Sequence, residues 1–184
     1  MISVLTYSGQ EVDSLALRPE DVCIVDIAHA LANISRFCGH TQAPISVAQH
    51  SVFVSQLCSP ANQLQALLHD ASEAYLGDVT KWVKATPEMA AYREAEDRAQ
   101  RVIYERFGCV VEVADEVEQV DKLMVRYEGW RGYGRALPVE ASLGYGLPTE
   151  EERARVEPWT CWTWRAAEMM FLERFELLTR KPVS

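Results

Sequence analysis

The sequence predicts an all-α domain that begins with one short β piece. Apolar residues recur at helical spacing in several separate segments, and capping boxes begin two of those segments. Glycine residues close several of them. With 184 residues, of which 48% are hydrophobic, the chain is long enough to enclose a core, and we expect residues 1–184 to form a single domain.

Composition narrows the class of protein. The net charge of −9 argues against a general nucleic-acid binder, because phosphate backbones attract surfaces rich in Lys and Arg, but it leaves room for a small phosphorylated ligand. The five cysteines are scattered without a CxxC pair, which favours reduced thiols over a disulfide framework. The sequence also lacks the pattern of a signal peptide or a membrane span. We therefore expect a cytoplasmic protein that binds neither membrane nor nucleic acid.

The first half of the chain is predicted to hold the β piece and three helices. Pro19 stands in the first turn of the first helix, Gly39 closes it, and the capping box of residues 46–49 begins the second. Gly77 is the stop signal of the third. The predicted elements are a β piece at 2–7 and helices at 19–37, from 46 to the connection at Pro60, and from 62 to Gly77.

The second half is predicted to hold four more helices. Pro87 opens the first of them and Gly108 ends it, and residues 149–152 form a second capping box. The Gly-rich segment 129–148 is predicted to be irregular, either as a mobile flap or as an oligomer contact. The predicted helices are 87–107, 112–130, one from 149, and 159–179.

A polar cluster interrupts the apolar start of the third helix. His69 and Asp70 are adjacent, so on a helix their side chains point about 100° apart and can take two corners of one coordination sphere. Glu73 lies one turn further on, above the same point, and Asp78 follows the glycine stop. A buried polar run is costly unless it is paired, for example with a cation. The cluster therefore indicates a metal site.

Two residues elsewhere are candidates to complete this site. Helices joined by few residues are antiparallel neighbours, so His50 near the start of one helix and His69 near the end of the next are expected to lie level. Asp121 breaks the apolar side of its own helix. Taken alone, Asp121 reads as an ordinary surface or salt-bridged residue; taken with the first cluster, it is the fourth candidate ligand.

The order His50 … His69-Asp70 … Asp121 on successive helices resembles the HD-domain metal-dependent phosphohydrolases. The segments SVAQHSVFVSQL, ALLHDASEAYLGDVTKWVK and EVEQVDKLMVRYE are similar to segments of small bacterial 5′-deoxynucleotidases and phage deoxyadenosine triphosphate triphosphohydrolases. The resemblance covers residues 20–130 and implies an HD-domain helical bundle. It implies that these four residues hold a divalent cation, and that Glu73 and Asp78 handle water and protons.

The donor atoms and the neighbouring residues suggest which metal ions and which substrate groups the site binds. Two imidazoles and two carboxylates suit Mn²⁺, Co²⁺, Fe²⁺, Zn²⁺ or Ni²⁺ better than Mg²⁺ alone, although Mg²⁺ can accompany substrate phosphates. Arg36 matches the family's Arg-aromatic segment, in which Phe37 stands where members often have Trp. The candidates to neutralise phosphate charge or to contact the base and sugar are Arg36, Phe37, His40, Lys81, Trp82 and Lys84.

The resemblance favours a deoxynucleotide phosphohydrolase. Within that class, similarity to the phage enzymes and the loop cations Lys81 and Lys84 favour release of triphosphate from a dATP-like substrate, with 5′-deoxyribonucleotidase activity on monophosphates as the alternative. Glu118-x-x-Asp121 also resembles a motif of all-α nucleotide pyrophosphohydrolases, but the paired ExxE is missing. A further alternative is a non-catalytic interaction domain with a structural metal. Family members are commonly homo-oligomers, so we expect an oligomer here.

Overall fold

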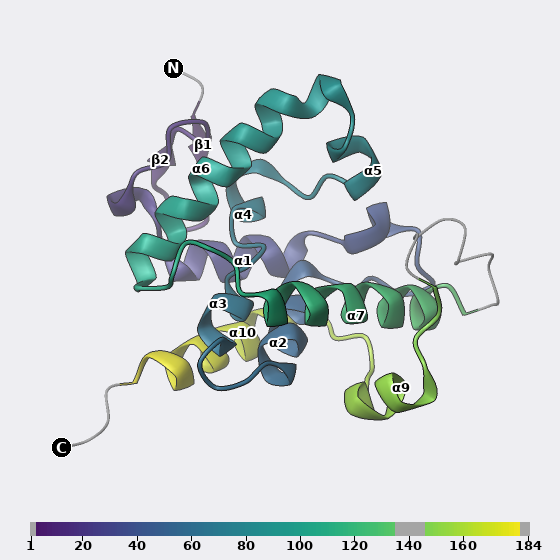
Figure 1. Cartoon of the computed structure of the whole chain (residues 1–184). Helices are drawn as coiled ribbons and strands as arrows, with labels where there is room; N and C mark the ends of the chain where they lie inside the picture. Colours follow the sequence, from purple (N-terminus) through teal and green to yellow (C-terminus); the bar gives the residue numbers. More distant parts are fainter. Residues whose placement is uncertain (1–2, 135–145, 181–184) are drawn as a thin grey trace.

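The computed structural model describes residues 3–134 and 146–180, and it is a bundle of helices with a small β-hairpin near the N-terminus (Figure 1). This architecture confirms the predicted all-α fold with a short β piece. The hairpin is antiparallel, with Val4 opposite Val12. The elements of the first half are β1 (Val4–Leu5), β2 (Glu11–Val12), the 3₁₀ turn η1 (Pro19–Asp21), α1 (Ile24–Asn33), the 3₁₀ turn η2 (Arg36–Gly39), α2 (Val47–Leu57), α3 (Gln63–Leu67) and α4 (Glu73–Leu76).

The second half holds the long helices. Gly108 ends α6 with a φ of 73°, which confirms the predicted stop, and Thr149 begins α9 through the predicted capping box. Residues 135–145, the middle of the Gly-rich segment predicted as a flap or oligomer contact, lie outside the described residues. The elements are α5 (Lys81–Lys84), the 3₁₀ turn η3 (Pro87–Met89), α6 (Ala90–Phe107), α7 (Asp115–Gly132), α9 (Glu150–Val156) and α10 (Trp164–Thr179).

Two predicted helices are shorter in the structure. The helix expected over 19–37 is divided into η1, α1 and η2, because residues 22–23 and 34–35 are extended. The N–H of Cys23 in the first extended pair donates to the hydroxyl of Tyr75, which is buried in the core. The last helix begins at Trp164 and not near Trp159, because Trp159 is buried against Tyr127 in an extended segment.

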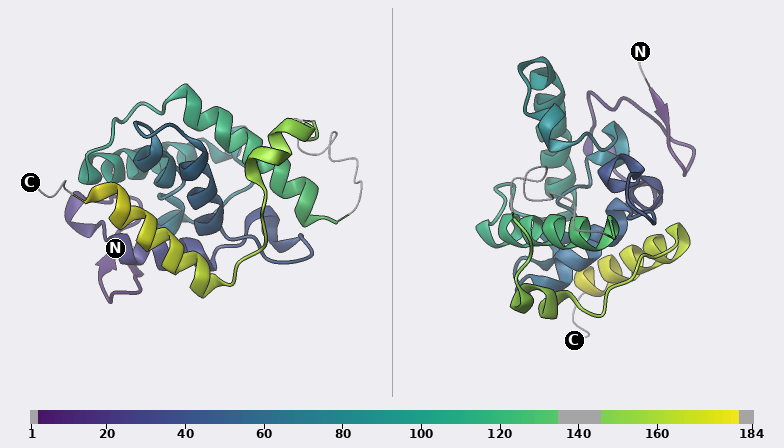
Figure 2. Two further views of the ribbon diagram at one scale, coloured as in Figure 1. Left: turned by 90° about the horizontal axis from the view of Figure 1, so that it is seen from below. Right: turned by 90° about the vertical axis from the view of Figure 1, so that its right-hand side faces the viewer.

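The core is centred on α2, which is buried on every side over residues 47–55. It packs against α1, α3, α7 and α10, and Figure 2 shows it between α7 and α10. A helix is typical of the middle of a domain when its side chains on every face are either apolar or hydrogen-bonded inside the protein. His50 lies on this helix and is fully buried, so its backbone is fixed by packing from all directions.

Two glutamines act as clamps between distant segments. Gln49 does not complete the reciprocal half of a capping box with Ser46; its side-chain amide bonds instead to the backbone of Thr160 and Trp162. The amide of Gln65 bonds to the backbone of the segment 110–114, which leads into α7. Buried amides with both ends satisfied give directional contacts between elements. They fix where α7 and α10 lie relative to α2 and α3.

Among the described residues, none of the helices is both long enough and apolar enough to cross a membrane. All five cysteines are free thiols.

Candidate metal centre

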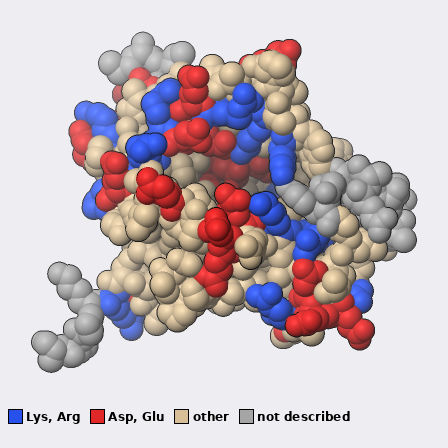
Figure 3. Space-filling view, in the orientation of Figure 1, with Lys and Arg blue, Asp and Glu red and all other residues tan. Residues whose placement is uncertain are grey.

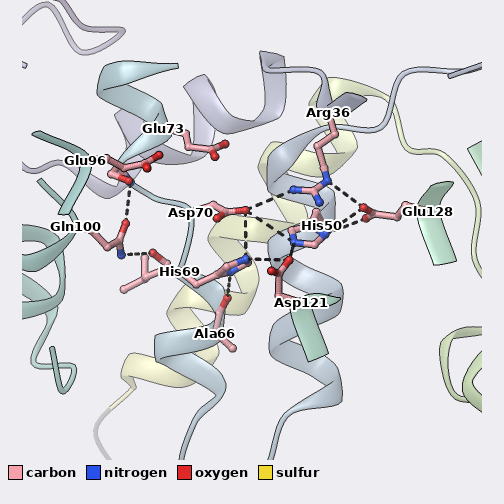
Figure 4. A network of polar contacts seen from close by, with 12 residues as sticks. Arg36, His50, Ala66, His69, Asp70, Glu73, Glu96, Gln100, Asp121 and Glu128 are labelled. Carbon is pink, nitrogen blue, oxygen red and sulfur yellow. Dashed lines mark hydrogen bonds and ion pairs between the residues drawn. The ribbon is translucent and has the colours of Figure 1, made fainter. Parts of the chain in front are cut away.

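The four predicted ligands converge from three parts of the fold (Figure 4). His50 comes from α2, Asp121 from α7, and His69 and Asp70 from the turn between α3 and α4. One ligand atom of each of His50, His69 and Asp121 lies within 4.8 Å of the other two. Asp70 faces the same point, because its Oδ2 is 3.2 Å from His69 Nε2 and 3.8 Å from His50 Nε2. The convergence expected from the sequence is therefore present.

The local backbone at His69 and Asp70 differs from the prediction. The sequence predicts one helix from residue 62 to Gly77, but α3 ends at Leu67 and α4 begins only at Glu73. The Gln100 side chain from α6 bridges the gap: its Nε2 donates to Leu68 O at 2.7 Å, and its Oε1 accepts from Ser72 N at 3.0 Å. These bonds satisfy backbone groups of the turn, so the break in the helix costs little. The turn presents the two adjacent ligands.

Both imidazoles are oriented by a contact on the ring edge away from the cluster. His69 Nδ1 lies 2.8 Å from Ala66 O, and His50 Nδ1 lies 3.1 Å from both carboxylate oxygens of Glu128. Carbonyl and carboxylate oxygens only accept, so each Nδ1 carries a proton, and each Nε2 faces the carboxylates of the cluster. His69 Nε2 is buried and makes ion-pair contacts with Asp70 Oδ2 at 3.2 Å and Asp121 Oδ1 at 3.8 Å, but no hydrogen bond among the described residues. The arrangement fits a metal ion.

The charges of the cluster favour a positive charge at its centre. Burial disfavours protonated imidazoles, but the neighbouring carboxylates outweigh it and raise the pKa of both His50 and His69. Burial would also raise the pKa of the carboxyl groups, yet the imidazoles hold the pKa of Asp70 and Asp121 below the usual range. Carboxylates that stabilise imidazolium will equally stabilise a cation in its place.

Glu73 and Asp78, the predicted catalytic residues, lie beside this cluster. Glu73 is only 4% exposed, and one of its carboxylate oxygens has no partner among the described residues. Burial, followed by the charges of Asp70 and Asp78, raises the pKa of Glu73 well above its usual value. Burial also raises the pKa of Asp78, which is partly exposed. Glu73 therefore keeps its proton to a higher pH than an exposed glutamate does.

A cavity of about 830 Å³ opens at the cluster, and every residue that the sequence singled out for catalysis or substrate contact lines it. Figure 3 shows it as a hollow with acidic side chains inside and basic ones along its edge. The short helix α5, where the sequence suggested a loop, carries Trp82, which is 53% exposed at the rim. Phe37 packs edge-on against Tyr133. The predicted residues that line the cavity are Arg36, Phe37, His40, Asp70, Glu73, Asp78, Lys81, Trp82, Lys84 and Asp121.

Two of the predicted phosphate-binding cations are already paired with carboxylates. Lys84 Nζ lies 2.5 Å from Glu96 and 3.4 Å from Glu73. Arg36 Nε donates to Glu128 at 2.9 Å, and its Nη1 lies 3.5 Å from Asp70. Arg36 therefore lies against the cluster, with only 12% of its side chain exposed.

Glu128 is a residue that the sequence reasoning missed. It is fully buried and contacts both His50 and Arg36. One signal was available, because Glu128 follows Asp121 by seven residues on the same helix, which places the two on one face about two turns apart. Its partners, at sequence separations of 78 and 92, could not be identified from spacing.

No protein-family model matches the chain. It is 35% identical over 128 residues to the uncharacterized protein YfdR of Escherichia coli K12, a match that covers 70% of this chain and 71% of YfdR. It is also 42% identical over 110 residues to the uncharacterized protein RCAP_rcc00048 of Rhodobacter capsulatus, which covers 55% of this chain and 56% of that protein.

Proposed function

The chain belongs to the same protein family as YfdR, and from its candidate metal centre we propose that it is a metal-dependent phosphohydrolase that acts on a nucleotide. The observation that carries the proposal is the convergence of two imidazoles and two carboxylates at the edge of one cavity. The resemblance of its ordered motif to HD-domain enzymes supports the same reaction class.

An open reaction centre explains the surroundings better than a structural metal does. A structural site needs only its ligands and is closed, whereas a catalytic site keeps access for substrate. Here the cluster borders a cavity of about 830 Å³, a volume within the usual range for small-molecule sites. Glu73 adds a buried carboxyl with a raised pKa, which a structural site would not need.

We assign the metal to the first-row transition ions, Mn²⁺, Co²⁺, Fe²⁺, Zn²⁺ or Ni²⁺, held by His50, His69, Asp70 and Asp121. The mixed nitrogen and oxygen donors support this choice. When bound, such an ion supplies Lewis acidity toward a phosphoryl oxygen and makes water more acidic.

The chain's own residues then have distinct roles. Arg36 is charged, planar and held at the cavity wall, so it can orient a phosphate through paired N–H donors. Glu73, with its raised pKa, can give a proton to the leaving oxygen, and Asp78 can orient the attacking water. Lys84 bonds to Glu73 and helps to keep that carboxyl at the cavity.

Two substrate classes remain candidates within this proposal. The motif similarity to phage enzymes and the cations of α5 favour a deoxynucleoside triphosphate such as dATP. The pairing of Lys84 with Glu73 and Glu96 favours the alternative, a deoxynucleoside monophosphate, because less positive charge is then left for a long polyphosphate.

Product analysis tests both the activity and the substrate. The protein loaded with Mn²⁺ or Co²⁺ is incubated with a panel of deoxynucleoside mono- and triphosphates, and the released phosphates are identified by ³¹P NMR. Triphosphate indicates the first class and orthophosphate from monophosphates the second. Pyrophosphate would indicate the pyrophosphohydrolase alternative. Tight metal binding with no product from any nucleotide would reject the enzyme and favour an interaction domain.

A further inference from the structure

Glu128 is a buried carboxylate behind the metal centre. Its side chain is fully buried on α7 and faces two donors, the Nδ1 of His50 at 3.1 Å and the Nε of Arg36 at 2.9 Å. A buried charge is costly unless it is paired and hydrogen-bonded. In Figure 4 the Glu128 carboxylate faces both the His50 ring and the Arg36 guanidinium, which lie on the same side of it. Both partners belong to the site, and Glu128 itself does not line the cavity.

We propose that Glu128 is a positioning residue that fixes His50 for the metal and Arg36 for an anion, and so couples metal binding to anion binding in the cavity. The part concerning the metal depends only on the cluster of ligands. The part concerning the anion rests on the proposed function.

The effect on His50 follows from its tautomer and ring orientation. With Nδ1–H directed at a carboxylate, Nε2 faces Asp121 and the centre of the cluster, where its lone pair would be offered to a bound cation. A carboxylate behind a ligating imidazole also makes the ligating nitrogen more basic. Loss of such a partner typically lowers metal affinity about 10–100-fold.

The effect on Arg36 follows from the planarity of the guanidinium. Glu128 contacts the Nε edge of the group, and Asp70 lies 3.5 Å from Nη1. These two contacts restrict how the guanidinium is oriented at the cavity wall. Burial would lower the pKa of Arg36, but Glu128 and Asp70 outweigh it and keep the guanidinium charged. Without Glu128, the long side chain of Arg36 would lose its main anchor.

The substitution Glu128→Gln separates this role from simple space filling. The amide has nearly the same size, but it carries no charge, and only one of its two polar atoms accepts hydrogen bonds. Its NH₂ group would replace one of the two oxygens that lie 3.1 Å from His50 Nδ1, and Arg36 would lose the negative charge beside its Nε. A matched control is Glu152→Gln. This substitution likewise removes a carboxylate that is paired with an arginine, here Arg126 of α7, but neither of these two residues lines the cavity.

The test measures binding of Co²⁺ alone by calorimetry and visible absorption, and then binding of inorganic phosphate to the Co²⁺-loaded protein. We expect Glu128→Gln to lower Co²⁺ affinity about 10–100-fold, to change the visible spectrum and to weaken phosphate binding. Glu152→Gln should match the wild type in all three. Co²⁺ affinity within twofold of the wild type and an unchanged spectrum in a folded Glu128→Gln variant would overturn the proposal.

A second measurement needs no variant. In the wild-type protein loaded with Zn²⁺, ¹⁵N NMR should find the His50 proton on Nδ1, and a proton on Nε2 would overturn the proposal. Neither measurement requires turnover. A protein in which Glu128→Gln impairs Co²⁺ binding, but which hydrolyses no nucleotide, would contradict the proposed function and leave the role of Glu128 intact.

Discussion

The two histidines of the candidate metal centre are held in different ways. His50 lies on α2, which is buried on every side, and its ring is bonded to a buried carboxylate. His69 lies on an irregular turn whose backbone is bridged by one amide from another helix, and its ring is bonded to a neighbouring carbonyl. His50 is therefore held by a helix inside the core, whereas His69 is held by a turn that the Gln100 amide bridges. We therefore expect that loss of His69 impairs the metal site more than it destabilises the fold.

Removal of each histidine gives the largest expected effects and tests this difference directly. His69→Ala and Asp70→Ala should abolish Co²⁺ binding and any turnover. His50→Ala should do the same and should also lower the free energy of unfolding by about 3–5 kcal/mol, because Glu128 then loses a buried partner. Calorimetric Co²⁺ titration and urea unfolding of the metal-free variants measure the two effects. Equal stability losses in His50→Ala and His69→Ala would contradict the comparison.

Glu73 follows the turn and is expected to serve the reaction without holding the metal. Glu73→Ala should keep Co²⁺ affinity near that of the wild type and lower the rate of hydrolysis about 10²–10⁴-fold, the usual contribution of a general acid or base. Steady-state rates with the substrate identified by product analysis, together with Co²⁺ titration, measure this. Full activity in Glu73→Ala would remove its assigned role, and loss of Co²⁺ binding would make it a ligand.

Local signals in the sequence were sufficient for much of the fold. Ser46 and Thr149 begin helices and Gly77 and Gly108 end them, because caps and glycine stops act through backbone groups a few residues away. The convergence of the candidate ligands was also predictable, since imidazoles and carboxylates on apolar helices require a partner. Adjacency of His69 and Asp70 was visible directly.

The features that escaped prediction depend on contacts between distant residues. The break in the helix at residues 68–72 is stabilised by Gln100, at sequence separations of 28 and 32. The helix propensity of these residues does not reveal hydrogen bonds to a side chain so distant in the sequence. Glu128 was missed for the same reason, because only the folded chain brings Arg36 and His50 into contact with its carboxylate.

Gln100 offers a milder way to loosen the turn. Gln100→Ala removes both bonds to the turn and should lower stability by about 1–3 kcal/mol, with a decrease in Co²⁺ affinity smaller than that of His69→Ala. Gln49→Ala is the control, because it removes a buried amide clamp of the same kind that contacts the segment 160–162 instead of the turn. It should lower stability by a similar amount and leave Co²⁺ affinity unchanged. Thermal unfolding and Co²⁺ titration of both variants compare them, and equal metal affinities would show that the turn needs no clamp.

The smallest expected effect concerns the charge of Glu73 in the metal-free protein. Burial and the nearby Asp70 and Asp78 raise its pKa, although Lys84 and Arg36 act in the opposite direction. A carboxyl with a higher pKa in the folded state binds its proton more tightly there than when unfolded. Wild-type stability should therefore be highest, relative to Glu73→Gln, below the unfolded pKa near 4.5 and should fall as pH rises through the folded pKa. Urea unfolding in the presence of a chelator should show similar stability at pH 4 and a more stable Glu73→Gln variant at pH 8. A wild type that is the more stable of the two at pH 8 would mean that Lys84 outweighs the burial of Glu73, and the carboxyl could not then hold a proton for the leaving group.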